Sequence, residues 1–206
     1  MFYLENTWID SRYGEIARGE LLEKKSKFLS YVFTIHQEEE AIQKIEKIKQ
    51  DHKDARHVVY LYSVLEQGVN KIRFSDDGEP KGTGTKAIYE LLTKEEITNI
   101  CIIIVRYFGG ILLGAGPLSR AYLNTAREAL ILCQKQTLYL YEDREVILEY
   151  ASYEIVKQLL QPMIELRLVE IVSTAFADKV MLHLKIEKTR IEEVLHNISE
   201  YVLEIK

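Results

Sequence analysis

The stretch of sequence that determines the fold is NICIIIVRYFGGILLGAGPLSRAY, residues 99–122. Residues 99–107 form an almost uninterrupted apolar run, which predicts a β-strand buried on both faces. Four glycines follow between Gly109 and Gly116, and Pro117 suits the first turn of a helix that extends to about residue 134. A buried strand, a glycine-rich loop and a helix therefore follow one another in this stretch.

On the N-terminal side, runs rich in β-branched and aromatic residues alternate with amphipathic segments. They predict strands at residues 14–24, 27–35, 57–65 and 71–75 and helices at residues 38–52 and 86–94. The polar run that begins at Ser75 and includes Asp77-Gly78 predicts a turn after the last of these strands, because Asp-Gly favours positive φ.

On the C-terminal side, residues 135–143 look polar or exposed and the charge balance changes there, which predicts the junction between two domains. Beyond it, strands at residues 145–150, 166–174, 179–186 and 201–205 and helices at residues 153–164 and 189–200 give the order β-α-β-β-α-β. This order is typical of a ferredoxin-like domain. The sequence thus predicts an α+β protein with domains at residues 1–138 and 139–206.

Charge is distributed unevenly along the chain. Residues 1–140 carry 19 Lys and Arg against 19 Asp and Glu, whereas residues 141–206 carry 8 against 13. The bulk charge therefore shows no large basic surface for binding nucleic acid, but it is compatible with a local basic face on the first domain. The sequence shows neither the roughly 20 apolar residues that span a bilayer nor a signal peptide. With two isolated cysteines, this predicts a cytoplasmic protein without a membrane partner.

Three carboxylates lie within four positions of the polar turn, at Asp76, Asp77 and Glu79. Such a group is a candidate for binding a divalent cation or for acid–base catalysis; the alternatives are a turn with a binding role and a purely structural turn. The spacing does not match a calcium loop, and the histidines lack zinc-ligand spacing. We therefore predict no metal, no cofactor and no catalytic residue, and we favour a protein that is not an enzyme.

The glycine-rich loop has features of an anion site. A loop between a strand and a helix N-terminus exposes backbone N–H groups near the positive end of a helix dipole, and Arg106 and Arg120 flank this loop. It lacks the Gly-Lys-Ser/Thr of a Walker A loop and matches the dinucleotide-binding pattern only in part. The alternative is that the glycines permit a close crossing of two chain segments.

Four motifs occur together and in order: Lys25-Ser26-Lys27-Phe28, Ala55-Arg56-His57, the run from Ser75 to Thr83, and the run from Arg106 to Tyr122. In this combination the chain resembles the YigZ/IMPACT family. The resemblance implies that the first domain has the βα fold of a ribosomal-protein or elongation factor G domain. It also implies that the second is ferredoxin-like, as at the C-terminus of elongation factor G. For the eukaryotic members, it implies regulation of translation through a protein partner.

These features lead to three hypotheses. The first, which we favour, is a non-enzymatic protein of translation that binds RNA or the ribosome through one face of the first domain. The second is a protein-interaction module of a stress or translation pathway. The third is an enzyme that uses Asp76, Asp77 or Glu79 with His57 in a closed pocket. The predicted contact residues are Lys27, Arg56, His57, Asp76, Asp77, Glu79, Lys81, Arg106, Tyr107, Gly109, Gly110, Gly114, Gly116 and Arg120.

The effect of replacing Arg106 distinguishes a binding role of this residue from a structural role. If Arg106, Arg120 and Lys81 contact phosphates, replacing Arg106 or Arg120 by alanine weakens RNA binding and leaves the protein folded. If Arg106 instead forms an internal ion pair with Asp76 or Asp77, its replacement lowers the melting temperature. The oligomeric state does not follow from the sequence.

Overall fold

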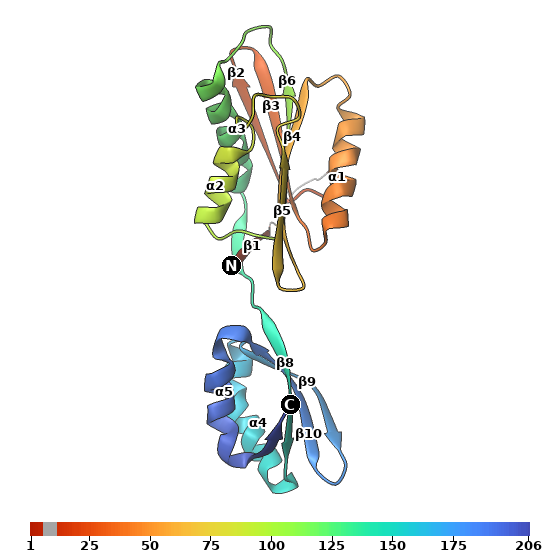
Figure 1. Cartoon of the computed structure of the whole chain (residues 1–206), viewed down its shortest axis with the longest axis vertical. Coiled ribbons are helices and arrows are strands. Elements are labelled where there is room, and N and C mark those ends of the chain that lie inside the picture. The colour runs from red at the N-terminus through yellow and green to blue at the C-terminus, as the bar shows by residue number, and fades with distance from the viewer. Residues whose placement is uncertain (6–11) are drawn as a thin grey trace. The chain divides into compact units, whose positions relative to one another are not determined.

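A five-stranded antiparallel sheet is the framework of the first part of the chain. The computed structural model describes residues 1–5 and 12–206 and divides into two units, residues 1–138 and 139–206. In the first unit the strand order is β2-β3-β6-β4-β5 (Figure 1), and each neighbouring pair is antiparallel. The strands are β2 (Ala17–Glu23), β3 (Ser26–Thr34), β4 (His57–Glu66), β5 (Val69–Ser75) and β6 (Ile100–Tyr107).

Helices cover both faces of this sheet (Figure 1). Helix α1 (Glu38–Asp51) packs against one face through an apolar stripe that includes Ala41, Ile45 and Ile48. Helices α2 (Lys86–Lys94) and α3 (Ala115–Leu130) pack against the other face. The unit therefore has two separate cores, one on each side of the sheet.

Strand β6 lies in the middle of the sheet and is buried on both faces, as its apolar run predicts. Its side chains alternate between the two cores: one receives Ile100, Ile102 and Ile104, and the other receives Cys101, Ile103 and Val105. Because side chains alternate along a strand, the next even residue, Arg106, is delivered to the side of α2 and α3. A charged side chain is thereby placed at the end of a core strand.

A second, two-stranded sheet lies where the sequence predicts only a junction. Strand β7 (Gln134–Thr137) pairs with β1 (Phe2–Glu5) in antiparallel register, and α3 ends at Leu130 rather than near residue 134. The four residues of β7 are all polar, so they show no alternation from which a strand is recognised. The pairing comes from a segment more than 130 residues away and leaves no local pattern.

The second unit has the predicted order β-α-β-β-α-β. Its antiparallel sheet has the strand order β11-β8-β10-β9, with both helices on one face (Figure 1). The elements are β8 (Tyr141–Leu148), α4 (Tyr150–Glu165), β9 (Val169–Phe176), β10 (Val180–Glu187), α5 (Ile191–Ile198) and β11 (Val202–Ile205). The predicted two-domain α+β fold is confirmed. No helix in the described ranges is long and apolar enough to cross a membrane.

Candidate functional site

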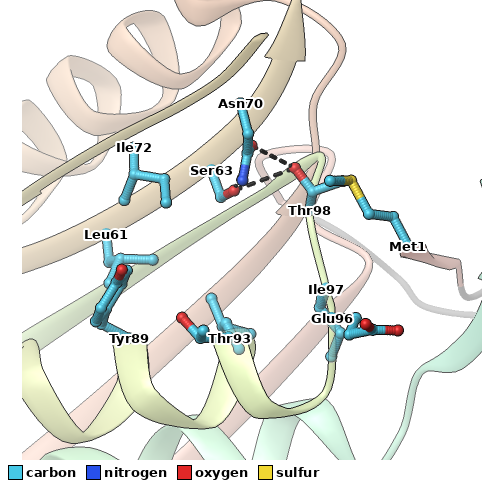
Figure 2. Close-up of a pocket in the computed structure, with 11 residues that line it drawn as sticks. Met1, Leu61, Ser63, Asn70, Ile72, Tyr89, Thr93, Glu96, Ile97 and Thr98 are labelled. Carbon is cyan, nitrogen blue, oxygen red and sulfur yellow. Dashed lines mark hydrogen bonds between the residues drawn. The ribbon is translucent and has the colours of Figure 1, made fainter. Parts of the chain in front are cut away.

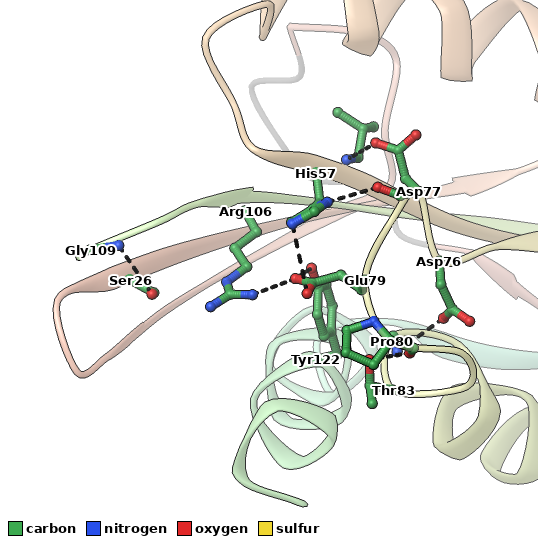
Figure 3. A network of polar contacts seen from close by, with 12 residues as sticks. Ser26, His57, Asp76, Asp77, Glu79, Pro80, Thr83, Arg106, Gly109 and Tyr122 are labelled. Carbon is green, nitrogen blue, oxygen red and sulfur yellow. Dashed lines mark hydrogen bonds and ion pairs between the residues drawn. The ribbon is translucent and has the colours of Figure 1, made fainter. Parts of the chain in front are cut away.

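The four sequence motifs meet at one end of the five-stranded sheet, which we name the motif end. Because the sheet is antiparallel, β3 and β4 begin at this end, whereas β2, β5 and β6 finish there. In the register, Arg106 of β6 is opposite Phe28 of β3 on one side and His57 of β4 on the other. The motif end comprises residues 24–28, 56–57, 75–85 and 106–122 (Figure 3).

Asp76 organises the loop that leads from β5 into α2. Its carboxylate accepts hydrogen bonds from the backbone N–H of Gly82 at 2.6 Å and from that of Gly84 at 3.0 Å. It also accepts bonds from the backbone N–H and the hydroxyl of Thr85, both at 3.0 Å. Four donors thus saturate this carboxylate, so Asp76 is a loop-shaping residue in the structure.

Asp77 ties the same loop to the start of β4. Its Oδ2 accepts a hydrogen bond from the backbone N–H of Val58 at 2.6 Å, and its Oδ1 lies 3.3 Å from Lys49 Nζ. Its backbone carbonyl accepts a hydrogen bond from His57 Nδ1 at 2.7 Å. Asp77 and Gly78 both have positive φ, as Asp-Gly predicts. The turn is therefore held by its acidic side chain as well as by its backbone.

Glu79 is the centre of a buried polar network (Figure 3). Its Oε1 lies 2.5 Å from Arg106 Nη1 and accepts a hydrogen bond from the Tyr122 hydroxyl at 2.7 Å. Its Oε2 lies 3.7 Å from His57 Nε2. The Glu79 and Arg106 side chains are only 4% and 5% exposed. Burial, with a smaller effect of Glu79, raises the pKa of Tyr122, which keeps its hydroxyl a neutral donor to the carboxylate.

Arg106 is fixed from several directions. Its guanidinium lies over the ring of Phe28 and over the ring of Phe108, with the guanidinium carbon 5.4 Å and 5.7 Å from the two ring centroids. Its buried Nε has no hydrogen-bond partner in the described part of the chain. The internal ion pair that the sequence considers for Arg106 is thus present, but its partner is Glu79 and not Asp76 or Asp77.

Exposed cations surround this inward-facing acidic network. Those that form no ion pair with any residue that the structure describes are Lys24, Lys25, Arg56, Lys81 and Arg120. Lys27, in contrast, pairs with Glu20 at 2.8 Å. The three carboxylates already have partners in backbone donors, Arg106 and Lys49, so the unpaired charges within the motif end are positive even though the first unit is neutral as a whole.

The glycine-rich loop packs directly on the β2–β3 hairpin. The backbone N–H of Gly109 donates to Ser26 Oγ at 3.2 Å, and a Cβ at Gly109 would lie 2.0 Å from the carbonyl carbon of Lys25. The close crossing of two chain segments that the sequence considers is therefore present. Gly114 then precedes α3 with φ of 75° and no side-chain cap, which leaves N–H groups of the first turn without a side-chain partner.

Not every predicted contact residue joins the cluster. Tyr107 points to the α1 side of the sheet, where its hydroxyl lies 2.6 Å from His52 Nδ1. His52 Nε2 in turn lies 3.1 Å from the hydroxyl of Tyr31, and burial lowers the pKa of His52. Tyr107 thus belongs to a separate, partly buried polar chain behind the sheet.

Two cavities of the first unit lie away from the acidic turn. One of about 230 Å³ lies between α2 and strands β4 and β5, where Ser63, Asn70 and Thr98 form a hydrogen-bonded group (Figure 2). A more apolar cavity of about 340 Å³ is lined by Leu91, Leu130 and other residues of α2, α3, β1 and β7. Asp76, Asp77, Glu79 and His57 line neither. The closed pocket that an enzyme using these groups requires is therefore not formed by either cavity.

Other reactive groups give little support for catalysis. Among the described residues, no group of three His, Cys, Asp or Glu side chains is placed to hold a metal ion. Cys101 is buried, and burial raises the pKa of the Cys133 thiol to about 11, which disfavours the thiolate nucleophile.

Several residues of the motif end are not among the contact residues that the sequence predicts. Ser26 and Tyr122 lie within the recognised motifs but are not among the predicted contact residues, and Tyr122 lies on the buried face of α3. A tyrosine on a buried stripe needs a partner for its hydroxyl, and this requirement was the available signal. The Thr85 hydroxyl donates a hydrogen bond to Asp76, and Lys24 belongs to the exposed cations; neither residue has a distinctive sequence signal.

Comparison with known proteins agrees with the motifs. The family model of the Impact N-terminal domain matches residues 24–130. A protein of Haemophilus influenzae described as an IMPACT family member is 35% identical over 179 residues, which cover 86% of this chain and 84% of the relative. YigZ of Escherichia coli, also described as an IMPACT family member, is 37% identical over 109 residues, which are 52% of this chain and 53% of YigZ.

A solved structure has the same fold. This crystal structure, described as that of a hypothetical protein, superposes with a TM-score of 0.57 at 26% identity and covers 90% of both chains. The motif end lies entirely within the matched Impact N-terminal domain. The chain belongs to the IMPACT family.

Proposed function

We propose that this protein binds RNA, including RNA of the ribosome, through the motif end and without catalysing a reaction. The observation that carries the proposal is the placement of the charged side chains at the motif end. Asp76 is held by backbone donors, Glu79 by Arg106, and Asp77 by the backbone N–H of Val58 and by Lys49. The unpaired cations around them face solvent, so the surface attracts an anion although the motif is rich in acid.

The backbone adds donors to this surface. The glycine-rich loop and the uncapped first turn of α3 offer N–H groups beside Arg120, and a Cβ at Gly116 would lie 3.7 Å from Arg120 Nη1. Helix N-termini of this kind favour phosphate groups. In this proposal Arg106 supports the acidic turn from inside. The contacts with phosphate groups are made by Lys24, Lys25, Lys81 and Arg120.

Replacing Arg120 by alanine is expected to weaken RNA binding and its salt dependence. Loss of one phosphate contact lowers the magnitude of the slope of log affinity against log salt by about 0.7–0.9 and the affinity at 0.1 M salt roughly fivefold. The measurement is fluorescence anisotropy with labelled RNA and with isolated ribosomes at two salt concentrations.

The matched control for Arg120 is Lys94→Ala. Lys94 is an exposed cation at the other end of the same helical layer, in the last turn of α2. Equal losses in the two variants, or a wild-type affinity that does not change with salt, contradict the assignment of phosphate contacts to the motif end.

The two lysines at the tip of the β2–β3 hairpin are expected to strengthen RNA binding and to lower the stability of the fold. Lys24 and Lys25 have φ of 44° and 66°. These values lie in the left-handed region, which is energetically costly for residues other than glycine and asparagine. The double variant Lys24→Asn, Lys25→Gly supplies residues suited to a two-residue turn. We expect it to stabilise the fold by about 1–2 kcal/mol and to weaken RNA binding roughly tenfold.

Thermal denaturation and the same binding assay check this pair of effects. The control variant Lys24→Gln, Lys25→Gln removes the charges and keeps side chains at both positions, so it is expected to weaken binding without the gain in stability. If the Asn-Gly variant binds RNA as wild type does, the hairpin tip is not part of the RNA contact.

A protein partner is the second candidate, and one observation favours it. Ile111 and Leu112 of the glycine-rich loop are 43% and 84% exposed, beside the cations. An interface built mainly on such apolar contacts binds with weak salt dependence. The two salt concentrations therefore separate the two candidate functions.

A further inference from the structure

Phe108 presents an aromatic ring on the surface of the motif end. It follows β6 directly and is 42% exposed. The Arg106 guanidinium lies over its ring at 5.7 Å from the centroid. Because Arg106 is fixed by Glu79 and by the ring of Phe28, Phe108 rests on a rigid, buried support.

We propose that Phe108 is a stacking platform for an unpaired base, so that the motif end selects single-stranded over double-stranded RNA. This inference rests on the proposed function. Single-stranded nucleic acids are bound by positive surfaces that follow the backbone, combined with aromatic rings on which bases stack. Phe108 supplies such a ring at the motif end, which also carries the exposed cations Lys25, Lys81 and Arg120. A base inside a duplex already stacks on its neighbours and has no free face for this ring.

The charges favour a nucleic acid over a protein as the occupant. Ile111 and Leu112 of the same loop also expose apolar side chains, and an apolar protein surface would fit them. Covering the loop with such a surface removes the neighbouring cations from water without a counter-charge, which is costly. A strand of RNA places its phosphates against the cations and a base against the ring.

The experiment measures the affinity of the full chain for three labelled probes. They are a uridine oligonucleotide, the same oligonucleotide with abasic positions, and an RNA duplex of equal charge. Phe108→Ala is expected to weaken binding of the uridine oligonucleotide about 5- to 100-fold, the range of one stacked base. It leaves binding of the abasic and duplex probes within about twofold, whereas Phe108→Trp retains the affinity of wild type.

Two further variants separate the ring from apolar area and from folding. Leu112→Ala removes a more exposed apolar side chain from the same loop and is expected to change affinity by less than about twofold. Phe108→Leu keeps apolar volume without a ring and is expected to lose affinity as Phe108→Ala does. It also replaces Phe108→Ala as the test variant if the latter does not fold.

The outcomes distinguish the two proposals. If wild type binds none of the probes at low salt, the proposed function fails and this inference fails with it. If wild type binds the uridine, abasic and duplex probes equally, or if Phe108→Leu binds the uridine oligonucleotide as wild type does, RNA binding stands and the stacking role is wrong.

Discussion

Replacing Arg106 by methionine is expected to lower the free energy of unfolding of the first unit by about 3–5 kcal/mol, the usual cost of breaking a buried ion pair. Methionine is of comparable length and packs against Phe28, but it leaves Glu79 buried without a cation. The Tyr122 hydroxyl still donates to this carboxylate, yet a neutral donor does not replace the guanidinium. Urea denaturation measures the effect, and amide hydrogen exchange of β6 reports on the first unit alone.

Two controls show whether this cost comes from the pair. Arg120→Met removes an exposed arginine at the same end and is expected to change stability by less than about 0.5 kcal/mol. In a double-mutant cycle with Glu79→Gln, the combined variant is expected to cost about 2 kcal/mol less than the two single changes together. Additive effects, or a loss below about 1 kcal/mol for Arg106→Met, show that the pair does not stabilise the fold.

Because variants of Arg106 are expected to be unstable, a loss of RNA binding in such a variant can result from unfolding. The sequence favours a phosphate contact for Arg106, so that its loss weakens binding in a folded protein. The structure places its guanidinium inside the network of Glu79, which makes it the support of Phe108 and of the acidic turn. Reduced RNA binding by an Arg106 variant therefore has meaning only where hydrogen exchange shows that β6 is still protected.

The core of the fold could be predicted from the sequence because its signals are local. Residues 100–105 are apolar without alternation, and burial of β6 on both faces is the physical reason. The stripe of α1 and the order of elements in the second unit also follow from periodicity within single segments. The pairing of β1 with β7 could not be predicted, because both strands are short and β7 is entirely polar.

The candidate site could be predicted as a set of motifs but not as a network. Spacing places Asp76, Asp77 and Glu79 in one turn, but it does not give the direction of each side chain. The turn directs Asp76 toward the N–H groups before α2 and Glu79 toward β6. Only the antiparallel register places Arg106 beside His57, and that register depends on strands that are about 50 residues apart in the sequence.

Replacing Gly109 by alanine is expected to cost about 3 kcal/mol of stability, at the upper end of the range for overpacked positions. The new Cβ would lie 2.0 Å from the carbonyl carbon and 2.2 Å from the carbonyl oxygen of Lys25. Both atoms are backbone, so no side-chain rotation relieves the clash. The glycine-rich loop and the hairpin must then separate by more than 1 Å to restore ordinary contact distances of about 3.4 Å or more.

Gly110→Ala is the matched control, because the neighbouring glycine is needed for conformation and not for space. Gly110 has φ of 82°, and a Cβ there meets nothing within 4 Å, so its replacement is expected to cost only about 1 kcal/mol. Urea denaturation of both variants measures the difference, and equal costs contradict the close crossing. In the RNA assay, Gly109→Ala is expected to bind more weakly than Gly110→Ala. The reason is that the loop crosses the hairpin tip closely at Gly109, so a Cβ there displaces the loop from the hairpin, whereas a Cβ at Gly110 meets nothing within 4 Å.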